Sequence, residues 1–196
     1  MTNWQYECRV FMDSDPSAVR EAVENSMKDE GLSKKLQKET DTYCVGGATD
    51  IAVRVRGNQV KMKGPVKAVD DLVDEMSDER AYLPVSRSVI ADALGLPADK
   101  KDKSLPDLEA VKKYMKKKGS KTSTVEKDMA KYEGSNLEVE VSEVKIDGAQ
   151  KWTICLASSD PKRVREAAEK YGIKDMVDKG EAVKLCYAEA VKQMGQ

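Results

Sequence analysis

The sequence contains no histidine and few aromatic residues, and both absences narrow the functions it can have. Histidine is the usual general base near neutral pH, so hydrolysis by a Ser-His or Cys-His pair is excluded, as are zinc sites that use imidazole. Aromatic residues make up 5% of the 196 residues, which leaves few platforms for stacking nucleic-acid bases. The four cysteines form no Cys-x-x-Cys motif, and we expect reduced, mostly buried thiols.

An excess of charge of one sign is also absent. The 34 basic and 35 acidic residues give a net charge of −1, so any anion site has to be local. No apolar run approaches the roughly 18 residues of a membrane span, and the first ten residues lack the layout of a signal peptide. We therefore expect a cytoplasmic protein with neither nucleic acid nor a membrane as partner, and a homodimer stays open.

What the sequence does contain is a succession of short segments with strand or helix patterns. Strands are predicted over residues 4–12, 40–46, 50–56, 59–64, 80–85, 123–134, 136–148 and 150–158. Helices are predicted over residues 14–31, 65–76, 86–96 and 108–119, from about residue 160, and over 176–194. Eight mostly antiparallel strands with helices packed outside predict an α+β fold, with enough strands to close a barrel.

One predicted hairpin carries a concentration of positive charge. In VRVRGNQVKMKGP (53–65), cationic and apolar residues alternate on both sides of a Gly57-Asn58 turn. This register sets Arg54 opposite Lys61 and turns all four cations of the hairpin to one face. Exposure of that face to water is the ordinary interpretation, since charged residues are common on antiparallel strands.

Several other strands also carry charge at every second position, and this favours an anion-binding cavity over a solvated face. They contribute Glu7, Arg9, Lys127, Lys131, Glu138 and Glu140. If each strand turns its charged face inward, the charges meet inside a polar cavity. Clusters of arginine and lysine are what a multiply charged oxyanion requires, because each side chain neutralises one or two oxygens.

Short motifs on these strands resemble motifs of a known protein family and occur in the same order along the chain. QYECR (5–9) resembles an E-x-E-x-K first strand, and TDTYC (40–44) resembles a D-x-Y strand. VRVR (53–56) is similar to L-R-I-R, while VKMKGP (60–65), similar to L-T-x-K-G-P, is the most specific match. Residues 127–132 are similar to a K-x-R-x-x-Y region, and a carboxylate-bearing strand follows.

This order of motifs resembles the CYTH superfamily, or triphosphate tunnel metalloenzymes, of the class IV adenylate cyclase and thiamine triphosphatase type. The resemblance covers most of residues 4–172. It implies a single domain over residues 1–196, an eight-stranded antiparallel β-barrel or tunnel with C-terminal helices from about residue 160. It also implies binding of a triphosphate or nucleotide together with magnesium or manganese.

The resemblance also implies roles for individual residues. The implied phosphate-binding residues are Arg9, Arg54, Arg56, Lys61, Lys63 and Lys127. The implied metal ligands are Glu7, Glu138 and Glu140. Departures fall mainly on the metal side, where Gln5 replaces a glutamate and Thr153 and Cys155 stand where the last strand carries two. Neither Thr153 nor Cys155 suits magnesium, which needs several oxygen ligands. On the phosphate-binding side, Met129 stands where the family has an arginine.

Three hypotheses remain open. The first is a tunnel that binds a phosphorylated small molecule or inorganic polyphosphate, with weak or no hydrolase activity. The second is an active metal-dependent triphosphatase, a phosphoanhydride hydrolase, with a rearranged site. The third is a structural or interaction module whose interior is satisfied by ion pairs of Arg54 and Lys61 with Glu138 and Glu140. No catalytic residue is assigned in any of them.

Overall fold

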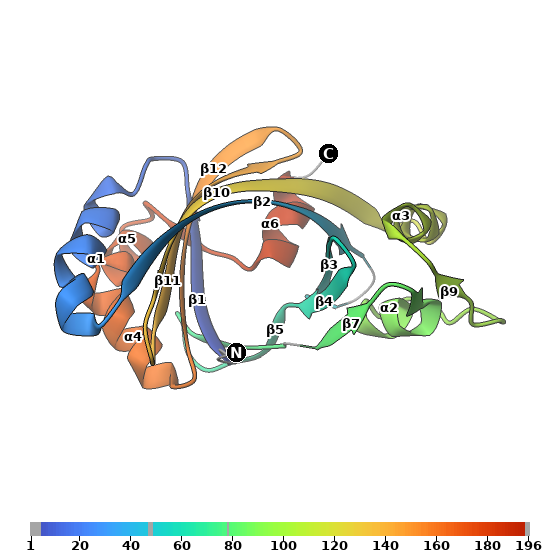
Figure 1. Cartoon of the computed structure of the whole chain (residues 1–196), viewed down its shortest axis with the longest axis horizontal. Helices are drawn as coiled ribbons and strands as arrows, with labels where there is room; N and C mark the ends of the chain where they lie inside the picture. Colours follow the sequence, from blue (N-terminus) through green and yellow to red (C-terminus); the bar gives the residue numbers. More distant parts are fainter. Residues whose placement is uncertain (1–4, 47–48, 78, 195–196) are drawn as a thin grey trace.

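The long strands form one antiparallel sheet that curls strongly on itself (Figure 1). The computed structural model describes residues 5–46, 49–77 and 79–194. The strands are β1 (Tyr6–Met12), β2 (Ser33–Val45), β3 (Ala52–Arg56), β4 (Gln59–Lys63), β5 (Pro65–Ala68), β6 (Asp74–Met76), β7 (Arg80–Tyr82), β10 (Lys121–Glu133), β11 (Glu138–Ile146) and β12 (Ala149–Ser158). Their order across the sheet is β5-β6-β1-β12-β11-β10-β2-β3-β4-β7, and β13 (Val183–Lys184) pairs with β1. A small second sheet joins β8 (Val85–Ser86) and β9 (Ser104–Leu105).

The two edges of the curled sheet are connected by the chain itself. β4 and β5 lie near opposite edges, yet only Gly64 separates them in sequence. A Cβ atom at this position would lie 2.5 Å from the backbone oxygen of Asp50, so the crossing requires glycine. The Gly64 carbonyl accepts a hydrogen bond from the Ser77 backbone N–H at 3.0 Å. The sheet order and the helices together confirm the antiparallel α+β fold that the sequence predicts.

The strand count differs from the prediction because residues 65–76 are not a helix. They form β5 and β6, joined by a turn in which the Asp70 carboxylate accepts hydrogen bonds from the backbone N–H groups of Leu72 and Val73, both at 2.8 Å. β6 then pairs with β1, with Glu75 opposite Tyr6. Pairing with this strand outweighs the helix-like spacing of the apolar residues. The sheet consequently follows a path of ten strands instead of eight.

Five helices cover the convex face of the sheet. α1 (Ser17–Glu30), α4 (Pro161–Lys170) and α5 (Ile173–Asp178) pack on apolar residues of β1, β10, β11 and β12, including Val10 and Leu156. α2 (Arg87–Ala93) and α3 (Leu108–Lys117) pack on β2, β3 and β4. These helices bury every second residue of each strand, so the alternate residues face the concave side.

The last helix, α6 (Tyr187–Met194), lies on the concave side, beneath the arch of β2 and β10 in Figure 1. Its buried face packs against inward-pointing apolar residues near one end of the strands: Phe11, Tyr43, Val45, Ala52, Val125, Val144 and Ile146. The single helix predicted over residues 176–194 is wrong, because α5, β13 and α6 occupy this stretch. Within the described residues, no helix is long and apolar enough to cross a membrane.

Candidate functional site

The remaining length of the concave face surrounds a cavity of about 370 Å³ lined mainly by charged side chains. All nine site residues predicted from the sequence line it: Glu7, Arg9, Arg54, Arg56, Lys61, Lys63, Lys127, Glu138 and Glu140. Along β1, β2, β3, β10 and β11 the inward positions change from apolar beside α6 to charged in the cavity. On β2, for example, Val45 packs with α6, whereas Glu39 lines the cavity.

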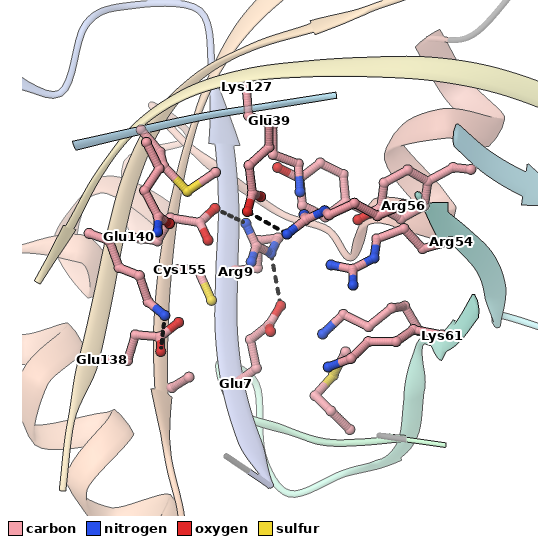
Figure 2. A pocket seen from close by; sticks show the side chains of 18 of the residues that line it. Glu7, Arg9, Glu39, Arg54, Arg56, Lys61, Lys127, Glu138, Glu140 and Cys155 are labelled. Atoms are coloured by element: carbon pink, nitrogen blue, oxygen red, sulfur yellow. Dashed lines mark hydrogen bonds and ion pairs between the residues drawn. The ribbon is translucent and has the colours of Figure 1, made fainter. Parts of the chain in front are cut away.

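One wall of the cavity is the β3–β4 hairpin. Its register is the predicted one, with Arg54 opposite Lys61 and Arg56 opposite Gln59. The Val53, Val55, Val60 and Met62 side chains lie in the core beneath α2 and α3. The packing of these apolar side chains turns the hairpin cations into the cavity, and Figure 2 shows Arg54, Arg56 and Lys61 together on this side.

Asp41, on the neighbouring strand β2, holds one cation of this wall and one cation of β10 in place. Its buried carboxylate accepts two hydrogen bonds from Arg56, from Nε at 2.6 Å and from Nη2 at 2.8 Å, and lies 3.1 Å from Lys127 Nζ. Burial alone would raise the pKa of Asp41, but Arg56, Lys127 and Arg54 outweigh it and hold the pKa at about 2. The carboxylate is therefore ionised and fixes the position of both cations.

Arg54 is less completely engaged. It is 8% exposed, and its Nη2 donates to Gln59 Oε1 at 3.0 Å. Its Nε lies 4.0 Å from Asp41 Oδ1 and has no hydrogen-bond partner among the described residues. A buried donor without a partner is costly unless a ligand or water satisfies it. Arg54 therefore has donor capacity to offer to a bound anion.

Arg9 lies between two carboxylates on the opposite side of the cavity (Figure 2). Its Nε donates to Glu7 at 2.8 Å and its Nη1 to Glu140 at 3.2 Å. The pKa of Glu7 would be raised by burial, but Arg9 and Lys63 lower it to about 2. Arg9 and Lys63 thus keep the Glu7 carboxylate ionised at neutral pH.

Tyr187 of α6 forms the aromatic floor of the cavity. The Arg9 guanidinium lies 4.6 Å and the Lys127 ammonium 4.2 Å from the centre of its ring. The ring also stacks on Tyr43, with centroids 5.0 Å apart. Cation–π contacts of this kind orient both cations without neutralising their charge.

Sequence reasoning left several lining residues out of the predicted site. They include Gln37, Glu39, Gln59, Arg80, Lys131, Glu133 and Tyr187. Lys131 shares the alternating pattern of Lys127 and could have been included, whereas Glu39 lies outside the strand predicted over residues 40–46, since β2 in fact begins at Ser33. Tyr187 carried no signal, since it reaches the cavity from a helix. With these residues, eight cationic and five acidic side chains line the cavity.

The ion pairs differ from those expected for a structural module. Glu140 pairs with Arg9, and Glu138 lies 2.9 Å from Lys131. Arg54 contacts Gln59 and Asp41 instead of either glutamate. The interior is thus extensively paired, but it retains both a cavity and an excess of positive side chains.

The carboxylates in the cavity do not form a set of metal ligands. Within the described residues, no three histidine, cysteine, aspartate or glutamate side chains are grouped so that they could hold a metal ion. Glu7 and Glu140 both bind Arg9, and Thr153 donates its hydroxyl hydrogen to the Val10 carbonyl. Magnesium can be held by one or two carboxylates with water as its other ligands, but here Arg9 already occupies both Glu7 and Glu140.

Comparison with known proteins adds a fold relationship. No protein-family model and no curated protein matches the sequence. Among solved structures, the PH1012 protein from Pyrococcus horikoshii is similar at 16% identity and a TM-score of 0.52, over 93% of this chain and 98% of that one. A conserved hypothetical protein from Pyrococcus furiosus is similar at 15% identity and the same TM-score, over the same shares of both chains. Identities this low concern the fold alone.

The architecture agrees with these comparisons. One antiparallel sheet curls around a cavity lined with charged side chains, and helices cover its outside. The motifs of the resemblance lie on β1, β2, β3, β4, β10 and β11 in the expected order. The chain shares its fold with these two Pyrococcus proteins, and the fold places the motifs that resemble the CYTH superfamily around one cavity.

Proposed function

We propose that the tunnel binds a triphosphate-bearing or polyphosphate anion, with weak or no hydrolase activity. The observation that carries this proposal is the β3–β4 hairpin, whose four cations line one wall of the cavity. Its partner would be a phosphorylated small molecule or inorganic polyphosphate. All 196 residues would form one domain around this site.

Size and charge both support an anion of this class. A cavity of about 370 Å³ lies within the range of about 300–1,000 Å³ that is usual for small-molecule sites. Two unit charges about 4 Å apart interact by roughly 4 kcal/mol at an effective dielectric constant of about 20. Such contacts oppose the cost of removing water from a triphosphate, and the four hairpin cations could supply several of them.

Calorimetric titration with tripolyphosphate at low salt tests this binding. The variant Arg54→Ala/Lys61→Ala/Lys63→Ala should bind at least about 100-fold more weakly, since loss of a charged hydrogen-bond partner costs about 1.5–3 kcal/mol. The matched control is Lys100→Ala/Lys101→Ala/Lys103→Ala, which removes the same charge from exposed positions outside the cavity. No binding to the wild type, or equal weakening by both variants, would refute the proposal.

The hydrogen bonds of the carboxylates support weak or absent hydrolysis. Hydrolysis needs a group that activates water, and Glu7 and Glu140 instead accept hydrogen bonds from Arg9. Phosphate release from tripolyphosphate with manganese measures this directly. Rapid release that disappears in Glu7→Gln, Glu138→Gln and Glu140→Gln would favour the metal-dependent triphosphatase instead.

A further inference from the structure

We propose that the Arg9 guanidinium takes the place of a divalent cation in this tunnel, so that the protein binds its anion without metal. The inference rests on the proposed anion binding and goes beyond it by assigning the charge that replaces the metal. It concerns the two carboxylates, Glu7 and Glu140, that the resemblance implies as metal ligands. Arg9 contacts both of them through different nitrogen atoms, at 2.8 Å and 3.2 Å.

The position of Arg9 is fixed by the sheet. β1 pairs with β12, and β12 pairs with β11, so that Arg9, Cys155 and Glu140 form one row across three strands. Glu7 precedes Arg9 by two residues and projects to the same face. The guanidinium therefore bridges carboxylates from β1 and β11 across the strand that separates them.

The surroundings of Arg9 favour a permanent guanidinium over an exchangeable ion. The side chain is 7% exposed and lies 4.6 Å from the centre of the Tyr187 ring. Its Nη1 also lies 3.5 Å from the Thr153 hydroxyl oxygen. A metal ion between the carboxylates would have to displace all of these contacts or lie directly beside a positive charge.

Neither Cys155 in this row nor Glu138 in the next row is a substitute ligand. Cys155, between Arg9 and Glu140 in the row, presents a thiol, and hard cations prefer oxygen. Glu138, the remaining carboxylate of the predicted set, lies 2.9 Å from Lys131 Nζ. The cavity therefore presents cations to a ligand from both walls, with Arg9 on one side and the hairpin on the other.

Manganese binding to the protein without any anion tests this assignment, with free Mn²⁺ followed by its electron paramagnetic resonance signal. At about 100 μM protein and 50 μM Mn²⁺, the wild type should leave the free signal unchanged. Arg9→Ala, which releases Glu7 and Glu140, should lower the free signal by at least about half. Adding Glu7→Gln and Glu140→Gln to Arg9→Ala should restore it. The matched control is Arg163→Ala, which removes an arginine paired with Glu30 and Glu166 outside the cavity and should bind no manganese.

A second measurement needs only the folded wild type. Its affinity for tripolyphosphate should change less than twofold when EDTA is added to metal-free buffer. Manganese binding by the wild type that Glu7→Gln abolishes would overturn the inference, as would no gain in folded Arg9→Ala or an equal gain in Arg163→Ala. A tenfold loss of tripolyphosphate affinity in EDTA would also overturn it. Absence of tripolyphosphate binding under all conditions refutes the proposed function instead, and the manganese titration of the wild type still decides the role of Arg9.

Discussion

Replacement of Asp41 by asparagine should destabilise the protein far more than the loss of one surface charge. The pKa of Asp41 is about 2 in the folded protein, against an ordinary value of 3.8. Since one pKa unit corresponds to about 1.4 kcal/mol, the ionised carboxylate contributes about 2 kcal/mol to the free energy of unfolding. Asparagine would also remove the buried counter-ion that Arg56 and Lys127 share, although Arg56 would keep its pair with Glu39, and breaking a buried pair costs about 3–5 kcal/mol. We therefore expect Asp41→Asn to lower the free energy of unfolding by about 2–5 kcal/mol at pH 7.

The pH dependence of the free energy of unfolding tests this prediction independently. Because the folded pKa lies below the unfolded one, the contribution of Asp41 is complete above the unfolded pKa and is lost as the pH falls towards 2. At pH 3 the difference between wild type and Asp41→Asn should be smaller than at pH 7 by about 1 kcal/mol.

Urea denaturation at both pH values, followed by circular dichroism, measures this difference. The control is Asp128→Asn, which breaks an exposed pair with Lys38 and should cost at most about 1 kcal/mol. Equal costs for the two variants, or a cost of Asp41→Asn that does not change with pH, would refute the electrostatic account.

Three further predictions concern the closure, the floor and the charge of the tunnel. Gly64→Ala should lower the free energy of unfolding by about 1–3 kcal/mol in urea denaturation, because its Cβ would lie 2.5 Å from the Asp50 backbone oxygen. An unchanged free energy of unfolding would mean that the backbone at this crossing relaxes freely. Tyr187→Phe should not lower thermal stability, because the buried hydroxyl has no hydrogen-bond partner among the described residues, while Tyr187→Ala should cost about 3–5 kcal/mol. A large loss of stability in the phenylalanine variant would reveal a missed partner. Tripolyphosphate affinity should fall by at least tenfold between about 20 and 300 mM NaCl in calorimetric titrations, because salt screens the hairpin cations, and an affinity independent of salt would exclude binding dominated by charge.

The parts of the fold that could be predicted from the sequence are those determined locally. A two-residue turn fixes the register of β3 and β4, so the direction of Arg54 and Lys61 follows from alternation alone. The pattern of residues 65–76 is compatible with a helix or with two short strands. Only the available edge of β1, about 60 residues away in sequence, selects the strands.

The composition of the site was predictable, but its pairing was not. Alternation identifies which side chains of a strand share a face, and this was enough to bring all nine predicted residues to one cavity. Which carboxylate meets which cation depends on the order of strands across the sheet. Arg9 meets Glu140 because β12 alone separates their strands, although 131 residues separate them in sequence. The roles of these residues, the extent of the domain and the oligomeric state stay predictions.

The placement of α6 affects how many protein molecules could bind to one polyphosphate chain. The helix and its apolar partners occupy one end of the concave face, so a long anion that enters from the other end would reach Arg9 and Lys127 by its terminus. A polyphosphate of any length presents two termini. Long chains should therefore saturate at two proteins per chain, however many phosphates each contains, whereas a surface that binds along the chain would take up more protein as the chain lengthens. The amount of protein bound would then depend on the number of chain ends in a mixture and not on the total amount of phosphate.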